Sequence, residues 1–393
     1  MKKLLCLLSA ILTYGTLAWG QAYGVCLSQD DGNLYISVPE FESFVVMDKS
    51  TGTMDFYHAK NSALDLSAGP FLVNGIAGSN GEAWITYGGS FRAHYADGVF
   101  ETYGSINGNY MFSNLTRDLE GNLWAISRGV SAYKLDSDLA LSGVYTLEST
   151  YADMSIIKSL AVGQDGSIWF FGIIYDDVEG GQQRSPLFKL TDGKFQFYPA
   201  TRASGISAIA VDAFGNVWCA RDKYNDLVVF DGSTLEKKMD LPEELKGHLF
   251  EDMKFDEQGR LWILSRAGFI SCVENGVCRV YTVPAMSYHT SMVSLSVCGE
   301  DVYAIGYAFV NNVNPETGQI DGYGARHARA ILYGISNGEV KATEIIPTVS
   351  NPTSIGQVGV TTADSPVFDL QGRKVDAIQH KGVYISNGKK VVR

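Results

Sequence analysis

The sequence predicts an all-β protein: a seven-bladed β-propeller with four antiparallel strands per blade, followed by a small C-terminal β tail. Three observations lead to this prediction. A turn-and-aromatic pattern recurs through the chain, a second hairpin signal follows it in nearly every repeat, and the composition changes after residue 347. The expected parts are a signal peptide at 1–20, the propeller at 21–347, a linker at 348–364 and a terminal segment at 365–393.

The recurring pattern consists of small or acidic residues, a glycine, a polar residue, an aliphatic residue and then an aromatic residue. The aromatic residues lie 40 to 49 positions apart, at Tyr35, Trp84, Trp124, Trp169, Trp218, Trp262 and Tyr303. A period of about 45 residues is typical of propeller blades, whereas separate β-sandwiches would not repeat one marker so steadily. We expect positive φ at the pattern's glycines, which are Gly32, Gly81, Gly121, Gly166, Gly215 and Gly259.

A second two-residue turn follows the marker in nearly every repeat. These turns are Thr51-Gly52, Asp97-Gly98, Asp192-Gly193, Asp231-Gly232, Asn275-Gly276 and Asn337-Gly338. Such pairs favour tight hairpins between strands of alternating hydrophobicity. Each repeat is therefore expected to hold four strands, named A to D from the inside outward.

The N-terminus has the three parts of a secretory signal. Lys2 and Lys3 are basic, residues 4–17 are apolar, and Ala18 and Gly20 provide small residues before a cleavage site. An uncleaved anchor is the alternative, but the apolar stretch is too short to span a bilayer. We expect export, and no later segment of the mature chain is apolar enough to form a transmembrane helix.

Export permits disulfides, so the five cysteines after the leader need examination. Around the Asn275-Gly276 turn, Cys272 is expected to face Arg279 while Val273 faces Cys278. This register places Cys272 and Cys278 on opposite faces of the hairpin, so they should not bond. Buried free thiols are expected, and no Cys/His spacing typical of a metal site is present.

The charge of the chain excludes one class of partner. The formal net charge is −12, and no run of lysine or arginine interrupts it. Nucleic acid is therefore not an expected partner.

Propeller geometry indicates where a ligand would bind. The A–B and C–D turns share one face, called here the turn face, while the B–C loops and the connections between blades share the opposite, loop-rich face. Long loops on a rigid scaffold commonly carry function. The polar residues expected on the loop-rich face, and proposed as ligand-binding, are Arg128, Arg221, Arg266, Tyr110, His248, His289, Asn114 and Asp252, with Asn74 and Glu251 nearby. They would suit a carboxylated or polyhydroxylated ligand; alternatively, they are solvated strand ends.

The repeat resembles the two-component-regulator propeller repeats of sensor ectodomains and, more loosely, the streptogramin lyase repeat. The residues that carry the resemblance are Asp118 to Trp124, Asp212 to Trp218 and Asp256 to Trp262. The resemblance covers most of residues 21–347 and implies blade turns, with no chemistry attached to them.

Two enzyme classes offer alternative interpretations. Sialidases clamp a carboxylate with three arginines, but this chain has Leu123, Val217 and Leu261 where that family has a hydroxyl residue. Streptogramin-type lyases use histidine and carboxylate around a metal, and the candidates here are His248, Glu251 and His289.

No cofactor is evident in the sequence. Asp176, Asp177 and Glu179 form an acidic loop that could hold Ca²⁺, although a solvated loop is favoured. No metal site is assigned.

The last 29 residues closely resemble the C-terminal sorting domain of type IX secretion cargo. The residues that carry this resemblance are Asp369, Leu370, Gly372, Arg373, Gly382, Tyr384, Gly388 and Lys389. It implies passage through the export machinery to the periplasm, recognition by an outer-membrane translocon and delivery to the cell surface or medium. The structural alternative is an extra strand pair on the propeller.

The sequence thus favours an exported, non-catalytic module that binds a glycan or protein outside the cell. The alternatives are a carbohydrate-active hydrolase or lyase on the loop-rich face, and a sensor fragment that meets a membrane partner. The identity of the ligand is left open.

Overall fold

The structure is a computed structural model. The residues that it describes are 26–38, 43–58, 73–87, 91–103, 112–127, 130–147, 155–163, 166–175, 183–184, 186–198, 205–284, 290–311, 326–345, 367–368, 374–375, 383–386 and 389–392.

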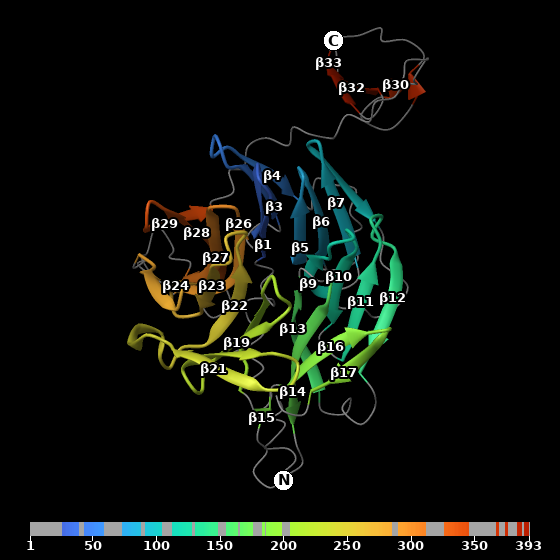
Figure 1. Ribbon diagram of the computed structural model, residues 1–393. Helices are drawn as coiled ribbons and strands as arrows, with labels where there is room; N and C mark the ends of the chain where they lie inside the picture. The colour runs from blue at the N-terminus through green and yellow to red at the C-terminus, as the bar shows by residue number, and fades with distance from the viewer. Residues whose placement is uncertain are drawn as a thin grey trace, which may run out of the picture.

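Seven four-stranded antiparallel sheets surround a central axis and form a seven-bladed β-propeller, as predicted (Figure 1). Blade one contains β1 (Leu27–Gln29), β2 (Asn33–Val38), β3 (Ser43–Asp48) and β4 (Met54–His58). Blade two contains β5 (Val73–Ser79), β6 (Glu82–Tyr87), β7 (Phe91–Ala96) and β8 (Val99–Tyr103). Blade three contains β9 (Phe112–Arg117), β10 (Leu123–Ser127), β11 (Ser131–Leu135) and β12 (Leu141–Thr146). Blade four contains β13 (Ser155–Val162), β14 (Ile168–Tyr175), β16 (Leu187–Thr191) and β17 (Lys194–Phe197), with β15 (Gln183–Arg184) paired to β14.

The remaining blades follow the same order. Blade five contains β18 (Ala208–Val211), β19 (Val217–Arg221), β20 (Asp226–Phe230) and β21 (Leu235–Asp240). Blade six contains β22 (Phe250–Phe255), β23 (Leu261–Ser265), β24 (Phe269–Glu274) and β25 (Val277–Thr282). Blade seven contains β26 (Thr290–Cys298), β27 (Asp301–Asn311), β28 (Arg326–Ser336) and β29 (Glu339–Ile345). A short 3₁₀ helix, η5 (Glu243–Leu245), connects blades five and six.

In blades three, five and six, the recurring turn is held by a carboxylate that the sequence places six residues before the marker tryptophan. In blade three the indole Nε1–H of Trp124 donates to Asp118 Oδ2 at 2.8 Å, while the backbone N–H of Asn122 donates to Asp118 Oδ1 at 2.8 Å. The same aromatic-to-aspartate bond occurs in Trp218–Asp212 (3.0 Å), Trp262–Asp256 (2.9 Å) and Tyr35–Asp30 (2.7 Å). The repeat thus encodes both a capped turn and the orientation of the aromatic ring.

The glycines of these turns have positive φ, as expected, in five of six cases. Gly81, Gly121, Gly166, Gly215 and Gly259 have φ between 78° and 85°. The expectation was wrong for Gly32, which is not among the positive-φ glycines. In its turn, Gly32 N–H donates directly to Asp30 Oδ1 at 3.0 Å.

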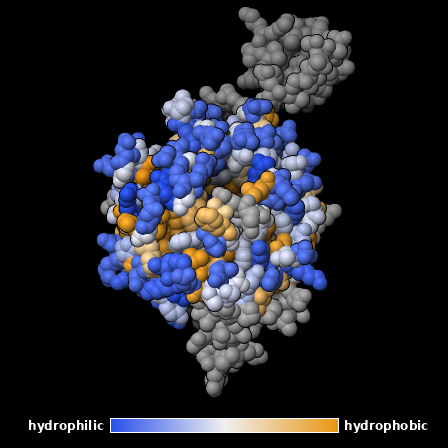
Figure 2. Space-filling model, in the orientation of Figure 1, coloured by the Kyte–Doolittle hydropathy of each residue, from blue (hydrophilic) through white to orange (hydrophobic). Residues whose placement is uncertain are grey.

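The core lies between neighbouring blades, where the marker aromatic packs into the blade that follows. Trp84 of blade two joins Phe112 and Leu123 of blade three, and Trp124 of blade three joins Phe170 of blade four. Figure 2 shows one side of the ring, where hydrophilic residues cover the outer parts and hydrophobic residues gather toward the middle.

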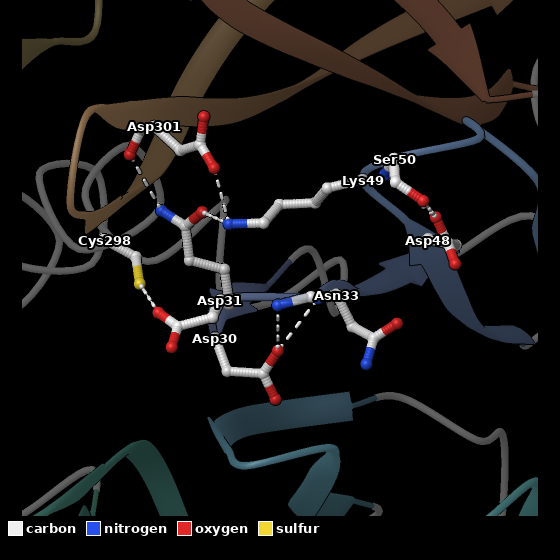
Figure 3. Close-up of polar contacts among 10 residues, drawn as sticks. Asp30, Asp31, Asn33, Asp48, Lys49, Ser50, Cys298 and Asp301 are labelled. Atoms are coloured by element: carbon white, nitrogen blue, oxygen red, sulfur yellow. Dashed lines mark hydrogen bonds and ion pairs between the residues drawn. The ribbon is translucent and has the colours of Figure 1, made fainter.

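Blade one closes the ring against blade seven through side chains. Leu34 and Ile36 share a cluster with Ile305 and Leu332. Lys49 Nζ lies 2.6 Å from Asp301 Oδ2 and its side chain is only 8% exposed (Figure 3).

Two further contacts span the same seam. Gln29 Nε2 donates to the Asp301 carbonyl at 3.2 Å, and Cys298 Sγ lies 3.3 Å from Asp31 Oδ1 (Figure 3). Every blade consists of consecutive strands, so within the described residues closure does not use a swapped strand.

The C-terminal tail forms its own small sheet in the order β31-β30-β32-β33. Its strands are β30 (Val367–Phe368), β31 (Lys374–Val375), β32 (Val383–Ser386) and β33 (Lys389–Val392). β32 and β33 form a hairpin in which Ser386 pairs with Lys389 and Val383 with Val392. The segment between residues 367 and 375 supplies the two short strands β30 and β31.

The predicted register of the cysteine hairpin is confirmed, and the cysteines are free as expected. The expected burial holds for Cys219 and Cys272 but not for Cys26, Cys278 and Cys298, which are half-buried. Cys272 pairs with Arg279 and Val273 with Cys278, and all five cysteines after the leader are free. Burial raises the pKa of Cys26 to about 12 and the pKa values of Cys272, Cys278 and Cys298 to about 11. These thiols therefore have little thiolate character near neutral pH.

Candidate functional site

The loop-rich face is best described between blades five and six, where residues 205–284 are continuous. Three of the predicted ligand-binding residues, Arg128, Tyr110 and His289, lie outside the described residues. The other five, Arg221, Arg266, His248, Asn114 and Asp252, can be placed. Their roles in ligand binding stay predictions.

Arg221 ends strand β19 and forms a two-point ion pair. Its Nε donates to Asp226 Oδ1 at 2.7 Å and its Nη2 to Oδ2 of the same carboxylate at 2.5 Å. Asp226 is 3% exposed, and the guanidinium also stacks on Tyr224 with 4.4 Å between Cζ and the ring centroid. Two-point pairing fixes the orientation of an arginine. Asp226 was not predicted from the sequence, although its position five residues after Arg221, across a short loop, was a usable signal.

Arg266 follows strand β23 and pairs with a carboxylate from the inner strand. Its Nε lies 2.5 Å from Glu251 Oε1, and the two side chains are only 19% and 16% exposed. Both residues were predicted on this face from the sequence, but their pairing was not. Arg221 and Arg266 therefore present ion pairs rather than isolated positive charges.

Asp252 connects two blades. Its Oδ2 accepts the backbone N–H of Leu295 in blade seven at 3.0 Å and also lies 3.1 Å from Lys254 Nζ. This carboxylate holds the inner strands of blades six and seven together close to the loop-rich face.

His248 belongs to the connection that carries η5 between blades five and six. The connection is fixed to blade five because Gly247 N–H donates to Asn225 Oδ1 at 2.8 Å. The imidazole lies against Phe269 of blade six, with 5.5 Å between ring centroids. His248 thus contributes a ring contact at the junction of the two blades.

Asn114 occupies an irregular position in the inner strand of blade three. Its φ is +51°, and the register between β9 and β10 shifts between Trp124 and Ile126. This combination marks a β-bulge, which reorients side chains along a strand and is frequent beside functional sites.

The described part of this face combines paired charges with aromatic rings. Tyr224 is 46% exposed beside Arg221, and His248 packs on Phe269 nearby in the chain. Such a surface favours recognition through hydrogen bonds and ring contacts over recognition of a strongly charged ligand.

Two negative findings apply to the described residues alone. Among them, no three His, Cys, Asp or Glu side chains lie close enough together to hold a metal ion. The acidic loop at Asp176, Asp177 and Glu179 lies outside the described residues. No helix in the described part of the chain is both long and apolar enough to cross a membrane.

No protein-family model matches the sequence, and no curated protein is significantly similar to it. Solved structures do resemble it. A streptogramin B lyase has a TM-score of 0.55 at 17% identity, covering 72% of this chain and 89% of its own. A catalytically inactive variant of virginiamycin B lyase from Staphylococcus aureus, solved with quinupristin, has a TM-score of 0.55 at 16% identity, covering 71% and 90%.

A third structure, YCF48 bound to D1 peptide, has a TM-score of 0.52 at 13% identity and covers 72% of this chain and 89% of its own. At these identities the likeness concerns the fold: this chain shares the propeller architecture of these proteins.

Proposed function

We propose that the protein is an exported, non-catalytic binding module whose loop-rich face takes an extended peptide segment of a partner protein. In this proposal, residues 1–20 direct the chain out of the cytoplasm. The terminal segment at 365–393 serves as the sorting signal for delivery to the cell surface or the medium.

One observation carries the binding part of the proposal: Arg221 and Arg266, two of the arginines expected to bind a ligand, each pair with a carboxylate of the same chain. Arg221 is matched by Asp226 and Arg266 by Glu251. A surface of paired charges beside rings suits a peptide, whose main chain offers neutral donors and acceptors. A uronic or sialylated sugar would instead draw on unpaired positive charge.

The comparison with solved structures supports the same class of ligand. YCF48 has this fold and is described as bound to a peptide. The fold is therefore compatible with a peptide ligand, although it does not specify one.

The test is a selection of displayed random dodecapeptides on the chain from residue 21 to 393. The dissociation constant of a selected peptide is then measured for the wild type, for Tyr224→Ala and for the control Phe214→Ala. Phe214 is 88% exposed in the A–B turn of blade five, on the turn face. Removing an exposed aromatic contact from the binding face should weaken binding about tenfold, a loss of about 1.4 kcal/mol.

The proposal expects Tyr224→Ala to weaken binding and Phe214→Ala to leave it unchanged. The reverse pattern would contradict it. It would also be overturned if no peptide were selected while neutral, uronic or sialylated oligosaccharides raised the melting temperature of the same chain.

A further inference from the structure

Five of the seven inner strands bulge at nearly the same level. In blades two, four, six and seven, the pairing of strand A with strand B shifts by one residue between the second and third residues of strand B after the marker aromatic. In blade three, the shift lies one residue pair closer to the marker. The residues inserted at these shifts, called here the bulge ring, are Asn74, Asn114, Lys158, Glu251 and Val293. The described inner strands of blades one and five keep a regular register.

The bulge ring lies toward the loop-rich end of the inner strands. Each inner strand starts at the loop-rich face and ends at an A–B turn, and each bulge occurs in the first half of its strand. The inner strands line the middle of the ring (Figure 1). A bulge disrupts the regular ladder and reorients the strand, so five at one level form a coordinated feature at the loop-rich end of the inner strands.

Contacts between neighbouring inner strands make this level rigid. In blade two, an added Cβ at Gly75 would lie 2.7 Å from the backbone nitrogen of Leu115 in blade three. Between blades six and seven, Asp252 accepts the Leu295 N–H at 3.0 Å. Rigid placement lowers the entropy lost on binding, which is what a recognition site requires.

We propose that Asn114 and Glu251 of the bulge ring contact the ligand at the loop-rich end of the inner strands, and that they recognise the main-chain amides of an extended peptide. This inference rests on the proposed function and deepens it. The Asn114 carboxamide provides donors and an acceptor that match a peptide group. The Glu251 carboxylate, oriented by Arg266, accepts N–H donors.

The first test replaces the Asn114 side chain without disturbing its backbone. Asn114→Gly preserves the positive φ because glycine adopts it readily. The control is Asn275→Gly, which makes the same chemical change at a φ of +49° in a C–D turn on the turn face. Asn114→Asp is a second variant, since it keeps the shape and removes the amide donors.

The second test changes the charge of the bulge ring. Glu251→Gln keeps the shape of the side chain, and its control is Glu274→Gln, which alters a residue paired with Arg279 on the turn face. Each variant is measured for its melting temperature and for its dissociation constant with the selected dodecapeptide. The comparison uses variants that melt within a few degrees of the wild type.

We expect Asn114→Gly, Asn114→Asp and Glu251→Gln each to weaken peptide binding about fivefold to tenfold, and both controls to bind like the wild type. Wild-type affinity in all three bulge variants would overturn the inference. If Tyr224→Ala still weakened binding in that case, the proposed function would be supported and only the role of the bulge ring would be overturned. If neither Tyr224→Ala nor the bulge variants changed binding, the proposed function and the role of the bulge ring would both be overturned.

Discussion

The aspartate of an A–B turn uses one carboxylate oxygen to cap the turn and the other to accept a hydrogen bond from the marker aromatic. In blade three, Asp118 Oδ1 accepts the backbone N–H groups of Glu120 and Asn122, while Oδ2 accepts the indole N–H of Trp124. The spacing of six residues between aspartate and tryptophan is therefore a hydrogen-bonding requirement. This explains why the pattern is recognisable in the sequence.

Replacing Asp118 with alanine should destabilise the propeller by about 2 to 3 kcal/mol. The change removes the acceptor of an indole whose residue is only 4% exposed, and it also removes the cap of the turn. The free energy of unfolding in urea measures the effect. Asp231→Ala is the control, because Asp231 caps an exposed C–D turn without a buried partner. Asp231→Ala should lower the free energy of unfolding clearly less than Asp118→Ala. Equal losses would contradict this role of the indole bond.

The same carboxylates predict how stability responds to acid. Burial raises the pKa values of Asp30, Asp118 and Asp212, but their hydrogen bonds outweigh it, so the net shift is downward. A lowered folded-state pKa gives stability that is complete above the ordinary aspartate value of about 3.9 and is lost as pH falls through the folded-state value. The free energy of unfolding should therefore decrease below about pH 4.

Urea unfolding at several pH values between about 7 and about 2.5 tests this dependence. Asp118→Asn is the matched variant, since its amide does not titrate, and it should show a shallower decrease. A stability that rises on acidification would contradict the assignment.

At the scale of the elements, glycines set how closely neighbouring inner strands approach. Gly75 of β5 leaves no room for a side chain beside Leu115 of β9. Gly78 of the same strand lies directly against the Tyr35 ring, which an added Cβ would overlap. Blade packing thus depends on the absence of these side chains.

Gly75→Ala should destabilise the chain by about 1 to 3 kcal/mol, because its Cβ would meet backbone that cannot move aside easily. Gly32→Ala is the control. Only Asp30 Oδ1 lies near its added Cβ, at 3.9 Å, and it does not have a positive φ. Thermal unfolding should lower the melting temperature of the first variant and leave the second close to the wild type; the same loss in both would contradict the close-approach argument.

The strands could be predicted from the sequence wherever the same turn residues recur in each blade. Alternation and Gly-containing turns predicted the four strands of each blade, and the register around Asn275-Gly276 followed from the turn alone. The bulges were not predicted, because one inserted residue leaves no periodic signal. The pairing of Arg266 with Glu251 was also missed, since it depends on the bulge that places Glu251.

At the scale of the whole molecule, closure of the ring joins residues far apart in the sequence. Lys49 and Asp301 are 252 positions apart, so no local pattern could have indicated their contact. The number of blades, in contrast, followed from counting one marker. Neither the ring closure nor the number of blades indicates the identity of a ligand, because the marker residues specify turns on the face opposite the proposed site.

The terminal segment yields a prediction about the destination of the chain. In a bacterium with a type IX secretion system, a chain ending at residue 364 should accumulate in the periplasm, while the full chain reaches the cell surface or medium. Fractionation and immunoblotting measure the distribution. Deletion of residues 348–357 is the control, because it shortens the linker and keeps the terminal segment. Equal export of the chain ending at residue 364 would contradict the sorting role.

Hydrogen–deuterium exchange of the chain from residue 21 to 393, with and without the selected dodecapeptide, locates the face that holds the ligand. We expect bound peptide to slow exchange at the loop-rich face, in segments 222–225, 242–252 and 266–269. Exchange in the A–B turns at 118–122, 212–216 and 256–260 should not change. Protection confined to the A–B turns would place the ligand on the turn face and contradict a binding site on the loop-rich face.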